Sequence, residues 1–215
     1  LPRRRLAGGV RRQGARRLHQ QAFANEAARA DVHLPSVTLQ TVGPTLQTYG
    51  TEKQKELILA RILTGDVHFA IGYSEADAGT DLASLRTSAR LDESTGEWVI
   101  NGQKMWTTGV TPPTTSGSPP APTGRAQAQG HHDLHRRHPR PGVLLDPIRT
   151  VDGSHHVNAT YFNDVRVPAD MVVGEVNGGW RLITTQLNHE RVMLGPAGRL
   201  EGLRDLVADW ATAQG

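Results

Sequence analysis

Two short stretches of the sequence carry side chains that could do chemistry. The first, YSEADAGTD over residues 73–81, combines small residues with hydroxyl and carboxyl side chains. Small residues let the backbone approach a bound ligand closely, and hydroxyl groups can donate hydrogen bonds to it. On these residues alone, an ordinary glycine-containing turn before a strand is an equally good interpretation.

The second stretch is GHHDLHRRHPRPG over residues 130–142, whose histidine spacing is partly compatible with a metal-binding helix. The candidate ligands would be His131, His132, His135 and His138. Pro139 and Pro141 would break any helix that could align them, and neither helical nor strand periodicity survives between Thr111 and Gly142. We therefore predict no metal site; a disordered proline-rich linker is one alternative.

Charge is distributed unevenly along the 215 residues, whose formal net charge is +3. Residues 1–20 hold seven arginines and no acid, and residues 111–142 hold four arginines against one aspartate. A nucleic-acid-binding protein would need both basic windows to be genuine protein sequence. The chain has no cysteine, no secretory signal and no apolar run of membrane-span length, so we expect neither a disulfide nor a membrane span.

The elements that must position these residues follow the order helical, β, helical. From about Gln20 to Gly65 the pattern is helical, and within it Thr51 and Gln54 form a predicted capping box. Gly65 is predicted to end that helix, whose apolar stripe is Leu57, Ile58 and Ile62.

From Val67 the residue types favour β-structure. EWVINGQKMW predicts a hairpin that turns at Asn101 and Gly102, and a further strand is expected from His156 to Val167, ended by Pro168. After Gly178 and Gly179 helical spacing returns through Trp180, Leu187, Val192, Leu200, Leu203 and Val207.

Five blocks in order resemble the acyl-CoA dehydrogenase family: FAIGYSEADAGTDLASLRTSA, INGQKMWTTG, FNDVRVP, VGEVNGGW and NHER. The resemblance runs from about Phe23 to Gly109 and from Asp146 to Ala213, and is greatest to mycobacterial dehydrogenases of sterol side-chain CoA thioesters. It implies an α+β fold with a partial N-terminal helical domain (1–65), a middle β-barrel domain (66–175) and the beginning of a C-terminal four-helix domain (176–215). We expect the chain to be truncated.

The resemblance also implies a reaction, the FAD-dependent α,β-dehydrogenation of an acyl-CoA thioester. Trp106 matches the family position where an indole covers the isoalloxazine, although a lone Trp on a strand would otherwise be a core residue. Ala76 and Asp77 stand where the family has Pro and Gly. The implied FAD contacts are Tyr73, Ser74, Gly79, Thr80, Trp106 and Thr108, with Thr80 also near the substrate.

By the same resemblance, Glu190 is the catalytic carboxylate and Arg191 contacts the thioester ligand. The alternative is that Glu190 is a surface acid paired with a neighbour. The family further implies electron-transfer flavoprotein as electron acceptor, a homo- or hetero-tetramer and a location in the bacterial cytoplasm. A catalytically inactive subunit of a heteromer is the competing function, and the presence of Glu190 argues against it.

The same resemblance suggests an origin for the two basic windows. Permissible codons for Ala126–Gly142, read one base later, encode PKHKGITIFIVDTRDPG, which is similar to the family's usual segment here. Codons for Gly9–Gly14 treated in the same way encode EYGGKG, although a mitochondrial presequence is an alternative for the arginine-rich start. We predict that 1–17 and 111–142 are frameshifted, that 111–142 is irregular, and that the printed chain is impaired.

Overall fold

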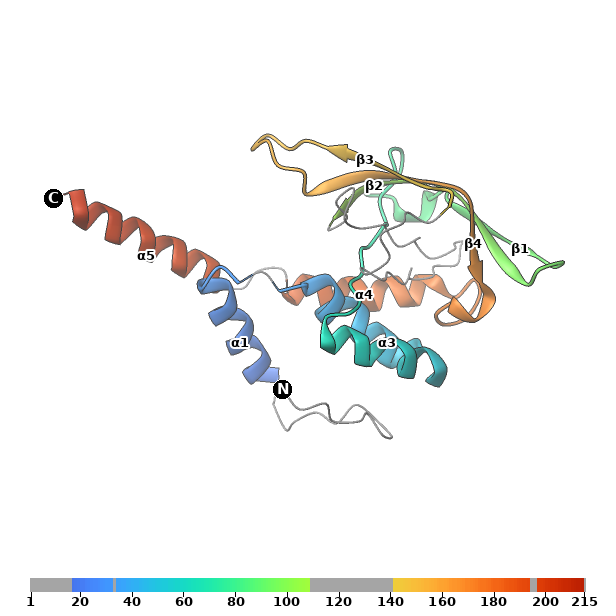
Figure 1. Ribbon diagram of the computed structural model, residues 1–215, viewed down its shortest axis with the longest axis horizontal. Coiled ribbons are helices and arrows are strands. Elements are labelled where there is room, and N and C mark those ends of the chain that lie inside the picture. The colour runs from blue at the N-terminus through green and yellow to red at the C-terminus, as the bar shows by residue number, and fades with distance from the viewer. Residues whose placement is uncertain (1–16, 33, 109–140, 194–196, 215) are drawn as a thin grey trace. The chain divides into compact units, whose positions relative to one another are not determined.

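The computed structural model describes residues 17–32, 34–108, 141–193 and 197–214 (Figure 1). Their contacts divide the chain into two compact units, Leu1–Ser36 with Glu190–Gly215, and Val37–His189. The predicted metal ligands and almost all of the two predicted frameshifted windows lie outside the described residues.

The first unit is built on helices α1 (Arg17–Arg29) and α5 (Ala197–Gln214), which pack against each other. Gly198 and Gly202, four residues apart on α5, lie so close to the backbone of α1 that an added Cβ would overlap Asn25 O and Arg29 O. An ion pair of 2.5 Å joins Arg29 to Asp205. The close approach of the two helices therefore depends on the two glycines.

The helical character predicted after Gly179 is confirmed, but the burial of its apolar side chains is not. Leu200, Leu203 and Val207 are each more than half exposed on α5, as is Trp180 on α4. Among the described residues, helical periodicity thus gave the element type without giving its covered face.

The second unit begins with a π-helix η1 (Val37–Val42) followed by α2 (Gly43–Tyr49) and α3 (Glu52–Thr64). The capping box is confirmed, because Gln54 N–H donates to Thr51 Oγ1 at 3.2 Å and Thr51 N–H to Gln54 Oε1 at 3.0 Å. Gly65 ends the helix in the left-handed region, with φ 78°. Of the predicted stripe, Ile58 and Ile62 are buried, while Leu57 is exposed.

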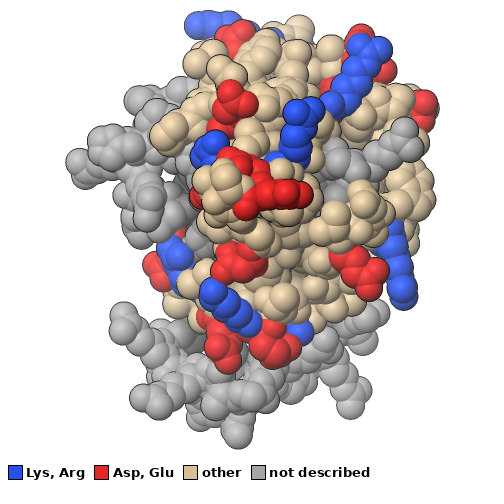
Figure 2. All heavy atoms as spheres, turned by 90° about the vertical axis from the view of Figure 1, so that its right-hand side faces the viewer, with Lys and Arg blue, Asp and Glu red and all other residues tan. Residues whose placement is uncertain are grey.

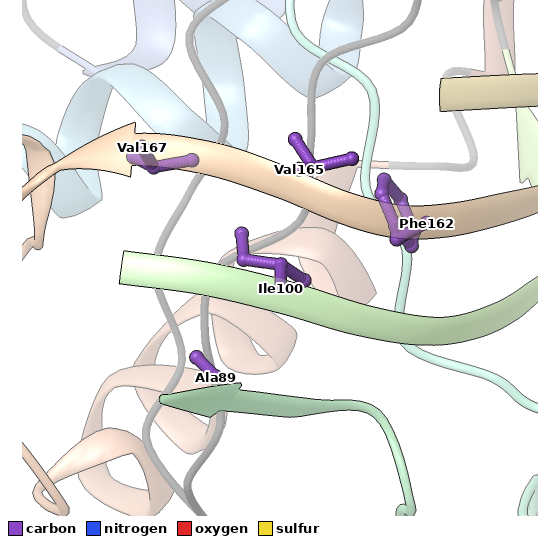
Figure 3. Packing of buried hydrophobic residues seen from close by; sticks show 5 residues of the cluster. All are labelled: Ala89, Ile100, Phe162, Val165 and Val167. Carbon is purple, nitrogen blue, oxygen red and sulfur yellow. The ribbon is translucent and has the colours of Figure 1, made fainter. Parts of the chain in front are cut away.

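An antiparallel sheet forms the β-part of this unit. Its strands are β1 (Ser88–Asp92), β2 (Glu97–Thr108), β3 (Val143–Ile148) and β4 (Val157–Pro168), in the spatial order β1-β2-β4-β3. Figure 3 shows the core on one face of the sheet, made by Ala89, Ile100, Phe162, Val165 and Val167. The strand predicted to end at Pro168 is confirmed.

The connections complete the second unit. A short 3₁₀ helix η2 (Leu82–Ser84) precedes β1, and η3 (Ala169–Met171) follows β4 and leads toward α4 (Gly179–Met193). Gln54 of α3 donates from Nε2 to Asp170 O and Val172 O, at 2.7 and 2.8 Å. This buried side chain thus connects α3 to the segment between the sheet and α4.

The α+β class is confirmed, whereas closure of the sheet into a barrel is not seen in the described residues. Their outer strands are β1 and β3, which pair with β2 and β4 and not with each other. The described sheet is therefore open.

The predicted turn at Asn101 and Gly102 is wrong. Both residues lie inside β2, at a register shift between Ile100 and Gly102, and the actual turn falls between Asp92 and Gly96. Gly102 has φ 148° and its added Cβ would come 2.5 Å from Thr87 Oγ1. A glycine with positive φ serves a β-bulge as well as a turn, and local sequence does not distinguish the two uses.

Candidate functional site

A second irregularity of β2 brings Trp106 to the surface. The register between β2 and β4 shifts between Lys104 and Thr107, so two residues of β2 oppose the single Ala159 of β4. Trp106 has φ 62°, a left-handed conformation that costs a non-glycine residue energy and occurs often at functional sites. Its indole is 56% exposed. The alternative that Trp106 is an ordinary core residue is therefore wrong.

The bulge also frees a backbone donor that binds the predicted ligand loop. Met105 N–H donates to Ser74 O at 2.8 Å, so residues 73–75 run beside the bulge. Thr108 is exposed and its hydroxyl donates weakly to Trp106 O, at 3.4 Å. The structure thus brings Tyr73, Ser74, Trp106 and Thr108 to one end of β2.

A buried ion pair anchors the same loop. Lys104 Nζ lies 2.7 Å from Glu75 Oε1, and the two side chains are only 3% and 9% exposed. Lys104 also donates to Tyr73 O at 3.1 Å, while Glu75 accepts from Arg86 N–H and Thr87 N–H at 2.7 and 2.9 Å. These contacts join the loop, β2 and the segment before β1.

The electrostatics of this pair favour two charges. Burial by itself would raise the pKa of Glu75, but hydrogen bonds from Lys104, Thr87 and Arg86 outweigh burial and lower the pKa to about 2. Burial lowers the pKa of Lys104, and Glu75 opposes that change. Glu75 is therefore a carboxylate at neutral pH and acts here as an anchor.

The turn that follows carries the remaining predicted contacts. Glu75 and Ala78 exchange backbone hydrogen bonds of 2.9 and 3.2 Å around Ala76 and Asp77, and neither central residue has a positive φ. The turn thus forms without the Pro and Gly of the family pattern. Gly79 and Thr80 follow it and are exposed, with nothing within 4 Å of a Cβ added at Gly79.

Helix α4 contributes a residue that sequence analysis missed. Gln186 is 1% exposed, and its Oε1 accepts a short hydrogen bond from the hydroxyl of Tyr73. It shares its buried helix face with Leu182 and Ile183. The only signal in the sequence was a polar amide within an apolar helical stripe, four residues before Glu190.

Glu190 and Arg191 lie near the end of α4, Glu190 partly buried and Arg191 exposed. Glu190 follows Gln186 by four residues, which places it one turn further along the same helix face. Within the described part of the chain, neither Glu190 nor Arg191 forms an ion pair. The surface ion pair considered as an alternative is thus not present there.

Other kinds of site find little support in the described residues. They contain no group of three or more His, Cys, Asp or Glu that could hold a metal. No helix among them is long and apolar enough to cross a membrane. On the face shown in Figure 2, basic and acidic side chains lie interspersed, unlike the one-signed surface expected for nucleic-acid binding.

Comparisons with known proteins agree on one family. The sequence model described as "Acyl-CoA dehydrogenase, middle domain" matches residues 70–165. The acyl-CoA dehydrogenase FadE29 of Mycobacterium tuberculosis is 54% identical over 203 residues, which are 92% of this chain and 51% of the relative. The chain therefore spans about half the length of this relative.

Solved structures give the same result. The Tcur3481-Tcur3483 steroid ACAD matches with a TM-score of 0.78 and 44% identity, over 96% of this chain and 53% of that one. The ChsE4-ChsE5 complex from Mycobacterium tuberculosis matches with a TM-score of 0.70 and 41% identity, over 85% of this chain and 46% of that one.

Proposed function

Because this chain belongs to the acyl-CoA dehydrogenase family, we propose that it supplies the flavin-facing part of an enzyme that desaturates an acyl-CoA thioester between Cα and Cβ. The observation that carries this proposal is the strained bulge of β2, which exposes the Trp106 indole beside a loop held by a buried ion pair. The domain boundaries expected from the sequence belong to the same proposal.

The residues present fit FAD. An exposed indole suits a flat aromatic ring, and exposed hydroxyls with an open glycine suit its polar edge and phosphates. The residues proposed to hold FAD are Tyr73, Ser74, Gly79, Thr80, Trp106 and Thr108. When bound, FAD supplies the acceptor for the hydride that leaves Cβ.

Glu190 is the proposed base that removes the Cα proton. A solvated carboxylate is a weak base for a thioester α-proton, so binding of the acyl chain must displace water from around it. The partial burial of Glu190 within α4 supports this role, as does its lack of an ion partner in the described residues. Arg191 is exposed and is proposed to hold the thioester ligand, with Thr80 also near the substrate.

Substrate and partners follow from the relatives. The matched Tcur3481-Tcur3483 protein is titled a steroid ACAD, and we propose a sterol side-chain or fatty acyl-CoA thioester as substrate here. Because that title and the ChsE4-ChsE5 title each name two chains, a tetramer with a second kind of subunit is proposed. Electron-transfer flavoprotein is the proposed acceptor, in the bacterial cytoplasm. The heteromeric relatives keep an inactive partner subunit as the second candidate.

Substitution of Trp106 in the full-length protein tests the proposal. Trp106→Ala should leave folding intact, because the indole is largely exposed, but should weaken FAD binding by about 10-fold, as expected for one lost ring contact. The measurements are the flavin absorption spectrum, FAD affinity by ultrafiltration and flavin bleaching by acyl-CoA. Trp180→Ala, at another exposed indole, is the matched control. Equal FAD affinity in the wild type and Trp106→Ala would contradict the proposed flavin site.

A further inference from the structure

Gln186 is a buried amide with an unsatisfied end. Its side chain is 1% exposed, and among the described residues its Nε2 has no hydrogen-bond partner. An amide has two donors and one acceptor oxygen, and burying it without partners costs free energy. The hydroxyl of Tyr73 meets the oxygen end, so the nitrogen end is left over. Turning the amide around would leave the oxygen over instead, because Tyr73 offers a single hydroxyl.

The surroundings of Gln186 locate the unsatisfied end within the proposed site. Tyr73 belongs to the loop that Lys104 and Met105 hold beside Trp106. Glu190 follows Gln186 by one helical turn. Buried polar groups without a partner are rare in native proteins, and one that lies next to ligand-binding residues can be satisfied when the ligand binds.

We propose that Gln186 is a ligand-binding residue whose Nε2 donates a hydrogen bond to a carbonyl oxygen of the bound ligand. Tyr73 orients the amide by donating to its oxygen. Carbonyl oxygens are offered both by the acyl thioester and by the flavin ring, and the experiment below separates these two sources. The inference rests on the proposed function, since it assumes that an acyl thioester and FAD bind here.

Replacing Gln186 by Met gives two effects of opposite sign. Met has a similar length and no hydrogen-bonding amide, so the ligand-free protein should melt at the same or a higher temperature. Ligand affinity should fall by about 3- to 10-fold, the effect of one hydrogen bond. A residue with only a packing role would leave ligand affinity unchanged.

Three further variants sharpen the test. Gln186→Glu keeps the shape but replaces the donor by an acceptor, and should lose at least as much affinity as Gln186→Met. Tyr73→Phe removes the orienting hydroxyl and should cause a smaller loss. Gln47→Met, at an exposed glutamine of α2, is the matched control and should change neither melting temperature nor affinity.

The experiment uses the full-length, flavin-loaded protein. FAD affinity is measured by ultrafiltration, and thioester affinity from the shift of the flavin spectrum on titration with a 2-enoyl-CoA, the unreactive product. A loss confined to the thioester titration assigns the carbonyl to the thioester, and a loss confined to FAD assigns it to the flavin. If Gln186→Met binds both as tightly as the wild type, the inference is overturned. If no saturated acyl-CoA bleaches the wild-type flavin, the proposed function itself has failed.

Discussion

Replacing Lys104 by Met tests whether the buried ion pair holds the loop of residues 73–75 against β2. Met retains most of the length of the aliphatic stem and removes the ammonium group, which is within hydrogen-bond distance of Glu75 Oε1 and Tyr73 O. The variant therefore deletes two contacts to the loop with little change in packing.

The expected cost follows from what is left behind. Glu75, 9% exposed, would keep the N–H groups of Arg86 and Thr87 but lose its only ion-pair partner in the described residues. Removing one member of a buried pair costs about 3–5 kcal/mol, and the two remaining hydrogen bonds favour the lower end. We expect a loss of about 3 kcal/mol in the free energy of unfolding.

The protein contains a matched control for this substitution. Lys53 Nζ lies 2.6 Å from Asp170, nearly the distance of the Lys104 pair, but its side chains are 76% and 51% exposed. Lys53→Met should therefore cost less than about 1 kcal/mol. Lys104→Met combined with Glu75→Gln should recover part of the loss, because a neutral amide can accept the same N–H donors without a counter-charge.

The assay is urea unfolding of the full-length protein together with amide hydrogen exchange. The backbone amides of Arg86, Thr87 and Met105 report locally, because they donate to Glu75 and to Ser74. Lys104→Met should speed exchange at all three, and Lys53→Met at none. Equal costs for the two lysine variants, with unchanged exchange at these amides, would refute the reasoning that the buried pair anchors the loop.

Three further predictions concern pH, catalysis and the gene. The lowered pKa of Glu75, about 2 against an ordinary 4.5, means that its stabilising contribution is complete above about pH 4.5 and is lost as the pH falls toward about 2; the difference in urea midpoint between wild type and Glu75→Gln should shrink over that range, and a constant difference would contradict the anchor. Glu190→Gln in the full-length protein should retain FAD and ligand while flavin bleaching slows by about 10²–10⁴-fold in stopped-flow absorbance, and bleaching at the wild-type rate would exclude Glu190 as the base. Resequencing of the gene should restore the family's usual segments across 111–142 and near the start, and the printed chain should purify colourless; native peptides matching GHHDLHRRHPRPG would refute the frameshift.

Local features of this protein could be predicted because their partners lie close in the chain. The capping box of Thr51 and Gln54 and the stop at Gly65 involve residues within one or two helical turns of each other. The ordered motif blocks were sufficient to indicate the family, and the comparisons confirm it. Asn101 and Gly102 mark the limit of local prediction, since the same backbone conformation serves a turn or a bulge.

The sequence by itself determined the element types, the helix ends and the family, because these depend on residue type, periodicity and short-range hydrogen bonds. Only the tertiary structure decided which side chains meet. Lys104 and Glu75 are 29 residues apart and Gln186 and Tyr73 are 113 apart, so neither pair follows from local spacing. The exposure of Trp106 likewise depends on the register of β2 against β4. Strand register and helix packing are set by contacts across the whole core, which no short stretch of sequence contains.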